Sequence, residues 1–246
     1  DSSEAPTTGR FEMGTHYTRL SPTQPTSSNP DQIEVAEVFW YGCPHCFEFD
    51  PMLEQWRTQQ PGYVNFVRVP AVWNPVLQLH ARAFYTAELL GKGAEMHGEF
   101  FREIHERNNR LDSEAALQEF FGRFGVAADA FKMQFDSFAV QEKLQRADEL
   151  NRRYRIESVP TIVVNGKYTT DAPQVGSYEA LLTRVDELLR RQHLRASGQR
   201  HESEPEEQLV RSHRLFLRQL TGLSFARISR VVPGRIPVTY ATSLLR

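Results

Sequence analysis

The sequence predicts an α/β fold, in which a strand–helix–strand unit is followed by a long helical segment and a hairpin. First, β-branched and aromatic runs at residues 33–41 and 64–69 flank an amphipathic helical stretch. Second, apolar residues recur at helical spacing through residues 74–154. Third, strand character returns just before Asn165-Gly166, the strongest short hairpin signal.

Length and composition narrow the class of protein. The 246 residues suffice for one large domain or two small ones, and 40% are hydrophobic, as in ordinary globular chains. The formal net charge of −2 argues against a generally basic nucleic-acid binder. No run approaches the ~18 consecutive apolar residues that a membrane span needs. Because the chain begins at Asp1, with neither Met nor an apolar signal core, we expect a processed or trimmed product.

The N-terminal segment has a different composition from the rest. Half of residues 1–30 are Ser, Thr or Pro, with 5, 6 and 4 of each. Such a segment has too few apolar groups to order itself, so we expect a leader or tether. Residues 16–20 could add one edge strand to the sheet.

The strand–helix–strand unit follows directly. The run at 33–41 is the first strand, and Pro44 opens the helix, because Pro is favoured at the first helical position. The helix should end near Pro61, with a kink at Pro51 inside it. The second strand at 64–69 should pair parallel with the first through a right-handed crossover.

The rest of the predicted domain is helical and then returns to the sheet. We expect four or five helices within 74–154, with starts or breaks at Asn74-Pro75, Asp112-Ser113 and Gly125. Residues 161–164 and 167–169 form the hairpin strands. Ser177 caps a last helix, whose apolar face comprises Leu181, Leu182, Val185, Leu188 and Leu189.

After Leu194 the composition shifts again. Residues 195–246 hold nine Arg, no Lys and four Glu, a net charge of +5 that leaves −7 on residues 1–194. A helix is plausible after Ser203-Glu204-Pro205-Glu206, but we expect an appendage without regular structure beyond it. The predicted organisation is a leader (1–30), a sheet domain (31–73 and 155–194), an inserted helical domain (74–154) and an Arg-rich tail (195–246).

The chain has two cysteines, Cys43 and Cys46, three residues apart. They either bridge each other or remain thiols. At the start of a helix, Cys43 faces the unpaired N–H groups and positive end of the dipole, which lower its pKa and favour the thiolate. Pro44 holds the helical start, and His45 can donate hydrogen bonds to the thiolate. One turn further, Cys46 should be more buried and act as the resolving sulfur.

Two other interpretations of the cysteine pair carry less weight. A zinc site needs about four ligands, and no second cysteine pair or close histidine pair completes one. We therefore expect no metal. Two inert structural cysteines are also possible, although a strand-to-helix turn is a typical place for reactive thiols. Redox exchange is the favoured interpretation.

Two further features make the redox interpretation more specific. Glu37 shares one face of its strand with apolar residues and lies six residues before Cys43. It is either a solvated edge acid or, as we prefer, a buried proton carrier beneath the disulfide. Val159-Pro160 directly precedes a strand. Pro160 is either an ordinary trans proline at a strand start or, in better agreement with redox chemistry, a cis proline opposite the cysteines.

These residues together resemble a known family. The run GCPHCFEFDPMLEQW at 42–56 and the run VPTIVVNGKY at 159–168, with a helical stretch between them, resemble the DsbA family of bacterial periplasmic thiol:disulfide oxidoreductases. The Pro-His dipeptide, the position of Glu37 and Val rather than Thr before Pro160 favour the oxidase branch. The resemblance covers about residues 14–194 and excludes the tail.

The resemblance implies a thioredoxin fold with an all-helical domain inserted between the strand–helix–strand unit and the cis-proline strand. It implies that a Cys43–Cys46 disulfide is donated to reduced secreted proteins and regenerated by DsbB, a quinone-linked membrane oxidase. It also implies a monomeric periplasmic protein, without cofactor or nucleic acid. The family is known for a low-pKa, strongly oxidising first cysteine, and we take that expectation over with the resemblance.

The resemblance also implies roles for single residues. Cys43 is the attacking nucleophile, Cys46 resolves, His45 stabilises the thiolate, and Glu37 is the buried acid. Val159-Pro160 binds the substrate backbone. The family often has Lys where Arg68 stands, and Arg does not release a proton in proteins.

Two alternative functions remain open at this stage. A disulfide isomerase or reductase would use the same chemistry, but the N-terminal segment is too short and polar for a dimerisation domain, and Thr does not precede Pro160. A non-catalytic interaction protein with a thioredoxin fold is the alternative from another class.

Overall fold

The computed structural model describes residues 12–198. The chain divides into two units, residues 1–194 and 195–246, and the following concerns the first unit with the helix that ends it. The helix predicted after Ser203 lies outside the described residues. Within the described part of the chain, no helix has the length and apolar character needed to cross a membrane.

Within residues 12–198, five strands and seven shorter helices precede a helix over residues 178–198, which is called the C-terminal helix below. The expected order of a strand–helix–strand unit, a helical segment and a hairpin is confirmed. The bounds are β1 Thr18–Arg19, β2 Ile33–Phe39, α1 Pro44–Thr58, β3 Val64–Pro70, α2 Pro75–Leu89, α3 Gly93–His105, α4 Glu114–Gly122, α5 Ala128–Phe135, α6 Phe138–Arg153, β4 Thr161–Val164, β5 Tyr168–Asp171 and α7 Ala172–Val175.

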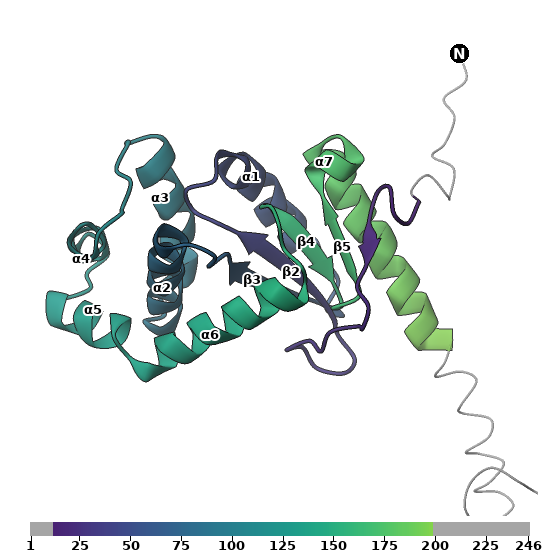
Figure 1. Cartoon of the computed structure of the whole chain (residues 1–246), viewed down its shortest axis with the longest axis horizontal. Helices are drawn as coiled ribbons and strands as arrows, with labels where there is room; N and C mark the ends of the chain where they lie inside the picture. The colour runs from purple at the N-terminus through teal and green to yellow at the C-terminus, as the bar shows by residue number, and fades with distance from the viewer. Residues whose placement is uncertain (1–11, 199–246) are drawn as a thin grey trace, which may run out of the picture. The chain divides into compact units, whose positions relative to one another are not determined.

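The strands form one sheet in the order β1-β5-β4-β2-β3 (Figure 1). β2 and β3 are parallel, as the crossover predicts, and the other neighbouring strands are antiparallel. All seven residues of β2 are buried, since this strand has neighbours on both sides and helices on both faces. Glu37 is paired with Arg68 of β3 in this register.

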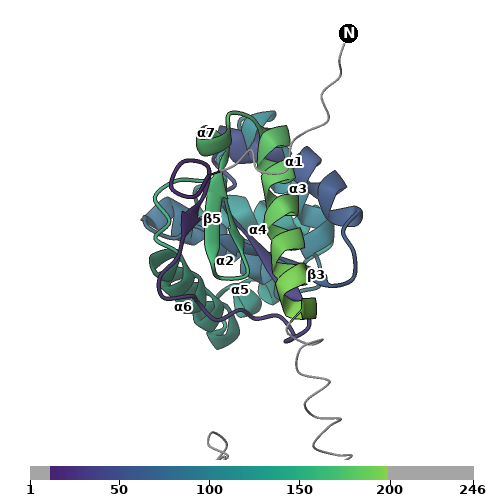
Figure 2. The same ribbon diagram turned by 90° about the vertical axis from the view of Figure 1, so that its right-hand side faces the viewer.

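Helices cover both faces of the sheet. Ile33 and Val35 of β2 pack against α1 and the C-terminal helix, which lies beside β5 (Figures 1 and 2). Ala36 and Val38 point to the opposite face and pack against α2 and α6. Because successive side chains of β2 point to opposite faces of the sheet, this one strand contributes to two separate cores.

The segment 74–154 folds into five helices, α2 to α6, in agreement with the prediction. The side chains of Asn74 and Ser113 cap α2 and α4, accepting hydrogen bonds from the backbone N–H groups of Leu77 and Ala116. Helices α2 to α5 share a core that is mostly aromatic. It includes Phe84, Phe100, Phe101, Phe120, Phe121, Phe131 and Phe135. This core continues to Tyr41 and the two cysteines.

The hairpin between β4 and β5 uses the predicted turn. Asn165 and Gly166 both have positive φ, 52° and 59°, and the N–H of Lys167 donates to the carbonyl of Val164 at 2.9 Å. Positive φ at both central residues suits the right-handed twist of a hairpin. A Cβ on Gly166 would lie 2.1 Å from the carbonyl oxygen of Gln24, so the chain leaves no room for a side chain there.

The expectation that residues 1–30 cannot order themselves is wrong for residues 12–30. Tyr17 and Leu20 are buried, and β1 adds the expected edge strand in a two-residue form. Ser27 and Ser28 donate hydrogen bonds to the buried carboxylate of Glu34 on β2. The segment is ordered because an existing sheet supplies both the apolar contact and the polar acceptor, which a composition argument leaves out.

Candidate active site

The Cys-Pro-His-Cys sequence lies at the junction between β2 and α1. Cys43 is the N-cap residue of α1, with extended backbone angles (φ −86°, ψ 119°), and Pro44 is the first helical residue. The side chain of Cys43 makes no capping hydrogen bond, so its sulfur remains available beside the first turn. This is the placement that the sequence predicts.

The two sulfurs are not bonded to each other in this structure, and they have different surroundings. Cys43 is 8% exposed and Cys46 is fully buried. A hydrogen bond from the Cys46 thiol, with backbone N–H groups of Cys46 and His45 and the charge of His45, lowers the pKa of Cys43 to about 6 against the opposing effect of burial. Cys43 is therefore largely a thiolate at neutral pH.

Cys46 has the opposite tendency. Burial is the main cause that raises its pKa, and the hydrogen bond to Cys43 and the negative charges of Cys43 and Glu37 raise it further. Cys46 therefore keeps its proton unless a nearby base removes it.

His45 lies at the surface, with a side chain 72% exposed and its Nδ1 3.5 Å from Oε2 of Glu48. Its charge is the smallest of the named contributions to the low pKa of Cys43. Tyr178, which the sequence did not single out, donates its hydroxyl to the backbone carbonyl of His45 at 3.1 Å. The ring of Tyr178 stacks on Phe49, so the C-terminal helix contacts the first turns of α1.

The loop before β4 faces the cysteines. The Val159–Pro160 peptide bond is cis, as predicted. The sulfur of Cys43 lies 3.4 Å from the carbonyl oxygen of Val159, to which its protonated form donates, although the two residues are 116 positions apart in the chain. The fold thus brings the reactive sulfur and the backbone of the cis-proline loop into direct contact.

Glu37 is buried, with 1% exposure, so the interpretation as a solvated edge acid is wrong. Its Oε2 accepts a hydrogen bond from Nε of Arg68 at 3.0 Å, whereas its buried Oε1 has no hydrogen-bond partner. Burial raises the pKa of Glu37 to about 7, against the opposing charge of Arg68. The carboxyl can therefore gain or lose a proton at neutral pH.

The guanidinium of Arg68 joins Glu37 to two acids of α1. It bonds Asp50 at 3.2 Å, and it also bonds Glu54. Asp50 was missed by the sequence reasoning, yet it lies four residues after Cys46, on the same helix face. This spacing in the sequence was therefore a signal that Asp50 belongs to the site.

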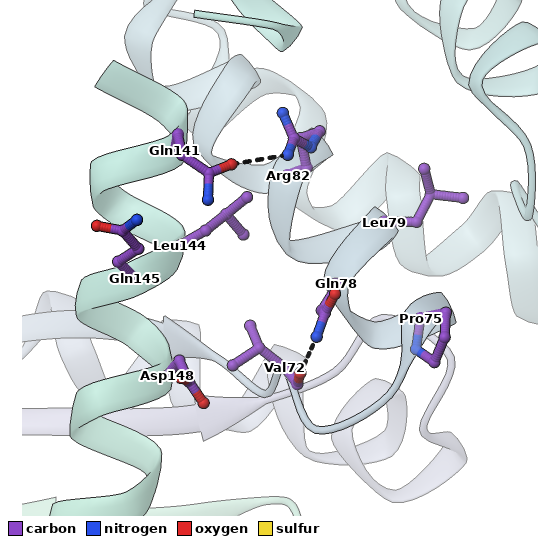
Figure 3. A pocket seen from close by; sticks show the side chains of 9 residues that line it. All are labelled: Val72, Pro75, Gln78, Leu79, Arg82, Gln141, Leu144, Gln145 and Asp148. Atoms are coloured by element: carbon purple, nitrogen blue, oxygen red, sulfur yellow. Dashed lines mark hydrogen bonds between the residues drawn. The ribbon is translucent and has the colours of Figure 1, made fainter. Parts of the chain in front are cut away.

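Other features of the surface do not add to this site. No group of three or more potential metal ligands comes together among residues 12–198. A hollow of about 380 Å³ lies between α2 and α6 (Figure 3). Its nine lining residues include none of the predicted site residues: Val72, Pro75, Gln78, Leu79, Arg82, Gln141, Leu144, Gln145 and Asp148. Arg82 of α2 donates to Gln141 of α6 across it, and Gln78 donates to the carbonyl of Val72 at its edge.

A sheet with helices on both faces, a dithiol at a helix N-terminus and a cis proline against the first sulfur define a thioredoxin-fold thiol:disulfide oxidoreductase. Comparison with proteins of known sequence supports this class. Residues 67–183 match the model of the DSBA-like thioredoxin domain. The chain is 35% identical to the thiol:disulfide interchange protein DsbA of Pseudomonas aeruginosa over 182 residues, 74% of this chain and 86% of that protein. It is 37% identical to the Pseudomonas syringae protein over 179 residues, 73% and 83% of the two chains.

Solved structures give the same result. The crystal structure of Pseudomonas aeruginosa DsbA superposes with a TM-score of 0.73 at 35% identity, covering 76% of this chain and 97% of that one. The oxidoreductase DsbA from Xylella fastidiosa gives 0.69 at 32% identity, covering 73% and 96%. The chain belongs to the DsbA family of thiol:disulfide interchange proteins, and the family and fold predicted from the sequence are confirmed.

Proposed function

We propose that the protein oxidises pairs of thiols in reduced secreted proteins by donating a Cys43–Cys46 disulfide. The observation that supports this most strongly is the contrast between the two sulfurs. Cys43, at the edge of the site, has a pKa lowered to about 6, mainly by the hydrogen bond from Cys46, and Cys46 is buried with a raised pKa. A stabilised Cys43 thiolate is a good leaving group, so its disulfide is readily given away.

The reaction has two exchange steps. A substrate thiolate attacks the Cys43 sulfur of the oxidised protein, which forms a mixed disulfide and releases Cys46 as a thiolate that takes up a proton. A second substrate thiolate then attacks the substrate sulfur of the mixed disulfide. The substrate leaves with a disulfide, and the two electrons remain on the protein as the Cys43 thiolate and the Cys46 thiol.

Glu37 is the proposed donor of the proton that Cys46 takes up. The negative charge of Glu37 is among the causes that raise the pKa of Cys46, which supports this role. With a pKa raised by burial to about 7, Glu37 is protonated in part of the molecules at neutral pH and can also accept the proton in the reverse direction.

Val159 and Pro160 are the proposed binding site for the substrate backbone. The contact between Cys43 and the Val159 carbonyl means that an extended segment bound along this loop places its cysteine against the Cys43 sulfur. We further propose that the protein acts as a monomer in the periplasm and that DsbB regenerates its disulfide; the family resemblance supports these points.

A stoichiometric oxidation assay tests the proposal. The oxidised full chain is mixed with a reduced, unfolded model protein with two cysteines, and loss of substrate thiols is followed with acid quenching. We expect about one substrate disulfide per molecule of protein, and none with Cys43→Ser. An insulin reduction assay on the reduced protein separates the alternatives: catalysis as fast as that of thioredoxin, with poor oxidation of the model protein, would favour a reductase.

A further inference from the structure

A chain of hydrogen bonds runs from the buried acid of the sheet into the helical segment. Glu37 bonds Arg68, and Arg68 bonds Asp50. The same Oδ1 of Asp50 lies 3.0 Å from Nε2 of His97 on α3, and Nδ1 of His97 lies 2.9 Å from the hydroxyl of Tyr41. His97 is buried, with 7% exposure, and the exchange steps described above do not use it.

The position of His97 is compatible with both of its protonation states. In the neutral ring, Nε2–H donates to Asp50, and Nδ1 accepts from the Tyr41 hydroxyl. In the charged ring, both N–H groups donate, one to Asp50 and the other to the Tyr41 oxygen. Neither state leaves a buried ring nitrogen unpaired, so the ring can change its charge with only a rotation of the Tyr41 hydroxyl.

The charges around His97 come from three elements. α1 contributes Asp50 and Glu54, and β3 contributes Arg68. Glu37 of β2 is linked to the ring through Arg68 and Asp50, and Tyr41 faces the ring as a neutral hydroxyl. Burial opposes ionisation of Glu54, but hydrogen bonds from Arg57 and Arg68 lower its pKa to about 2. α2 adds only the aromatic ring of Phe84.

Burial shifts the pKa values of two groups of this cluster, Glu37 and His97, in opposite directions. Arg68 keeps its charge, and Glu54 remains ionised. Burial lowers the pKa of His97, and Asp50 opposes that effect through its hydrogen bond. Burial raises the pKa of Glu37 to about 7.

We propose that the charge states of Glu37 and His97 are coupled electrostatically through the hydrogen-bonded Arg68 and Asp50 between them, and that His97 is a positioning residue for the proton transfer to Cys46. When Glu37 gives its proton to Cys46, the cluster gains a negative charge, and His97 takes one proton from solvent to restore the balance. The transfer of the Glu37 proton to Cys46 is part of the proposed function, and this step of the inference rests on it. The coupling between the two groups is measurable whether or not the protein oxidises a substrate.

The direct test is a histidine titration by NMR on the reduced full chain, with and without Glu37→Gln. The carboxylate of Glu37 favours the charged His97 ring, so its removal should move the His97 midpoint down by roughly half a pH unit or more. His80 is the internal control, since it is also buried but bonds Trp40 and the carbonyl of Arg110 instead. Its titration should be unchanged by the substitution.

Two outcomes overturn the inference: a His97 midpoint that is the same in both proteins, or a His97 ring that stays neutral from pH 4 to pH 9 in the wild type. The pH profile of mixed-disulfide resolution in His97→Gln gives a second measure, because loss of the coupling should move the inflection that Glu37 produces. A protein that shows the coupling but oxidises no thiols contradicts the proposed function alone. A competent oxidase with an unshifted His97 contradicts this inference alone.

Discussion

Cys43 and Cys46 have the same side chain and only Pro44 and His45 separate them, yet their surroundings change their pKa values in opposite directions. The thiol of Cys46 donates to Cys43 and lowers its pKa to about 6, whereas burial raises the pKa of Cys46. The difference arises from position: Cys43 caps the helix, where N–H groups point to it, and Cys46 lies inside the core. One sulfur is therefore suited to leave, and the other to hold a proton.

At this scale the first prediction concerns Glu37→Gln. In single-turnover resolution of a Cys43–glutathione mixed disulfide, Cys46 must lose a proton before it attacks. Because burial raises the pKa of Glu37 to about 7, its carboxylate is present above that pH, and the wild-type rate should rise through about pH 7. The variant should fold and lack this inflection.

Alkylation of Cys43 is the control for that prediction, since it reports on the Cys43 thiolate and should change far less in Glu37→Gln. Superimposable pH–rate profiles for resolution in the two proteins would show that Glu37 is only a tolerated buried acid.

At the scale of elements, the site depends on the sheet holding three segments in register. β2 leads into the cysteine helix, β3 places Arg68 opposite Glu37, and β4 fixes the loop of Val159 and Pro160. The residues before β2 contribute as well, because Gln24 donates its N–H to the carbonyl of Gly166 at 2.8 Å and closes over the hairpin turn.

The second prediction tests this packing. Gly166→Ala places a side chain at a positive φ, and its Cβ would meet the Gln24 carbonyl at 2.1 Å. We expect a loss of about 1–3 kcal/mol in the free energy of unfolding, measured with urea. Gly91→Ala is the matched control, since Gly91 also has a positive φ (69°) but its Cβ would meet nothing within 4 Å, and it should lose less stability than Gly166→Ala. Equal stability of the two variants would show that residues 12–30 are not docked on the hairpin.

The elements also show what the sequence can and cannot predict. Strand alternation placed Glu37 in an apolar row, and the Asn165-Gly166 pair predicted the turn, because both signals are local. The order of residues 12–30 was not predictable from composition, since it depends on tertiary contacts such as the pairing of Thr18 with Thr169 of β5. His97 lies on the apolar face of α3, but only the tertiary contact with Asp50 makes it part of the site.

At the scale of the whole molecule, the oxidation state of the cysteines should change stability. The hydrogen bond from Cys46 lowers the Cys43 pKa to about 6, below its unfolded value of about 8.5. The thiolate therefore stabilises the reduced fold fully above about pH 8.5, and this contribution is lost as the pH falls through about 6. At pH 7 the reduced form should melt several degrees above the oxidised form, although a cross-link alone stabilises a fold.

Calorimetry or circular dichroism melts of both forms, repeated from pH 5 to pH 8, measure this difference. It should shrink toward pH 5. A higher melting temperature for the oxidised form at pH 7 would mean that the thiolate is not stabilised as described.

The fourth prediction concerns the Arg-rich tail. In the helix over residues 178–198, Gln192 is the last buried residue, and Leu194 is 70% exposed. Truncation after Leu194 should therefore leave dithiol oxidation rates unchanged. Rates of the full and truncated chains with the same reduced substrate measure this, and a several-fold loss would instead point to a docking role, for example at an anionic membrane surface.

The central claim is that the Cys43–Cys46 disulfide is readily donated because Cys43 leaves as a stabilised thiolate. Its most direct test is the reduction potential, obtained by equilibrating the protein with glutathione redox buffers at pH 7 and counting the reduced fraction after acid trapping. We predict a potential more oxidising than about −200 mV, above the range of glutaredoxins. A potential below that range, toward thioredoxin at about −270 mV, would contradict the account.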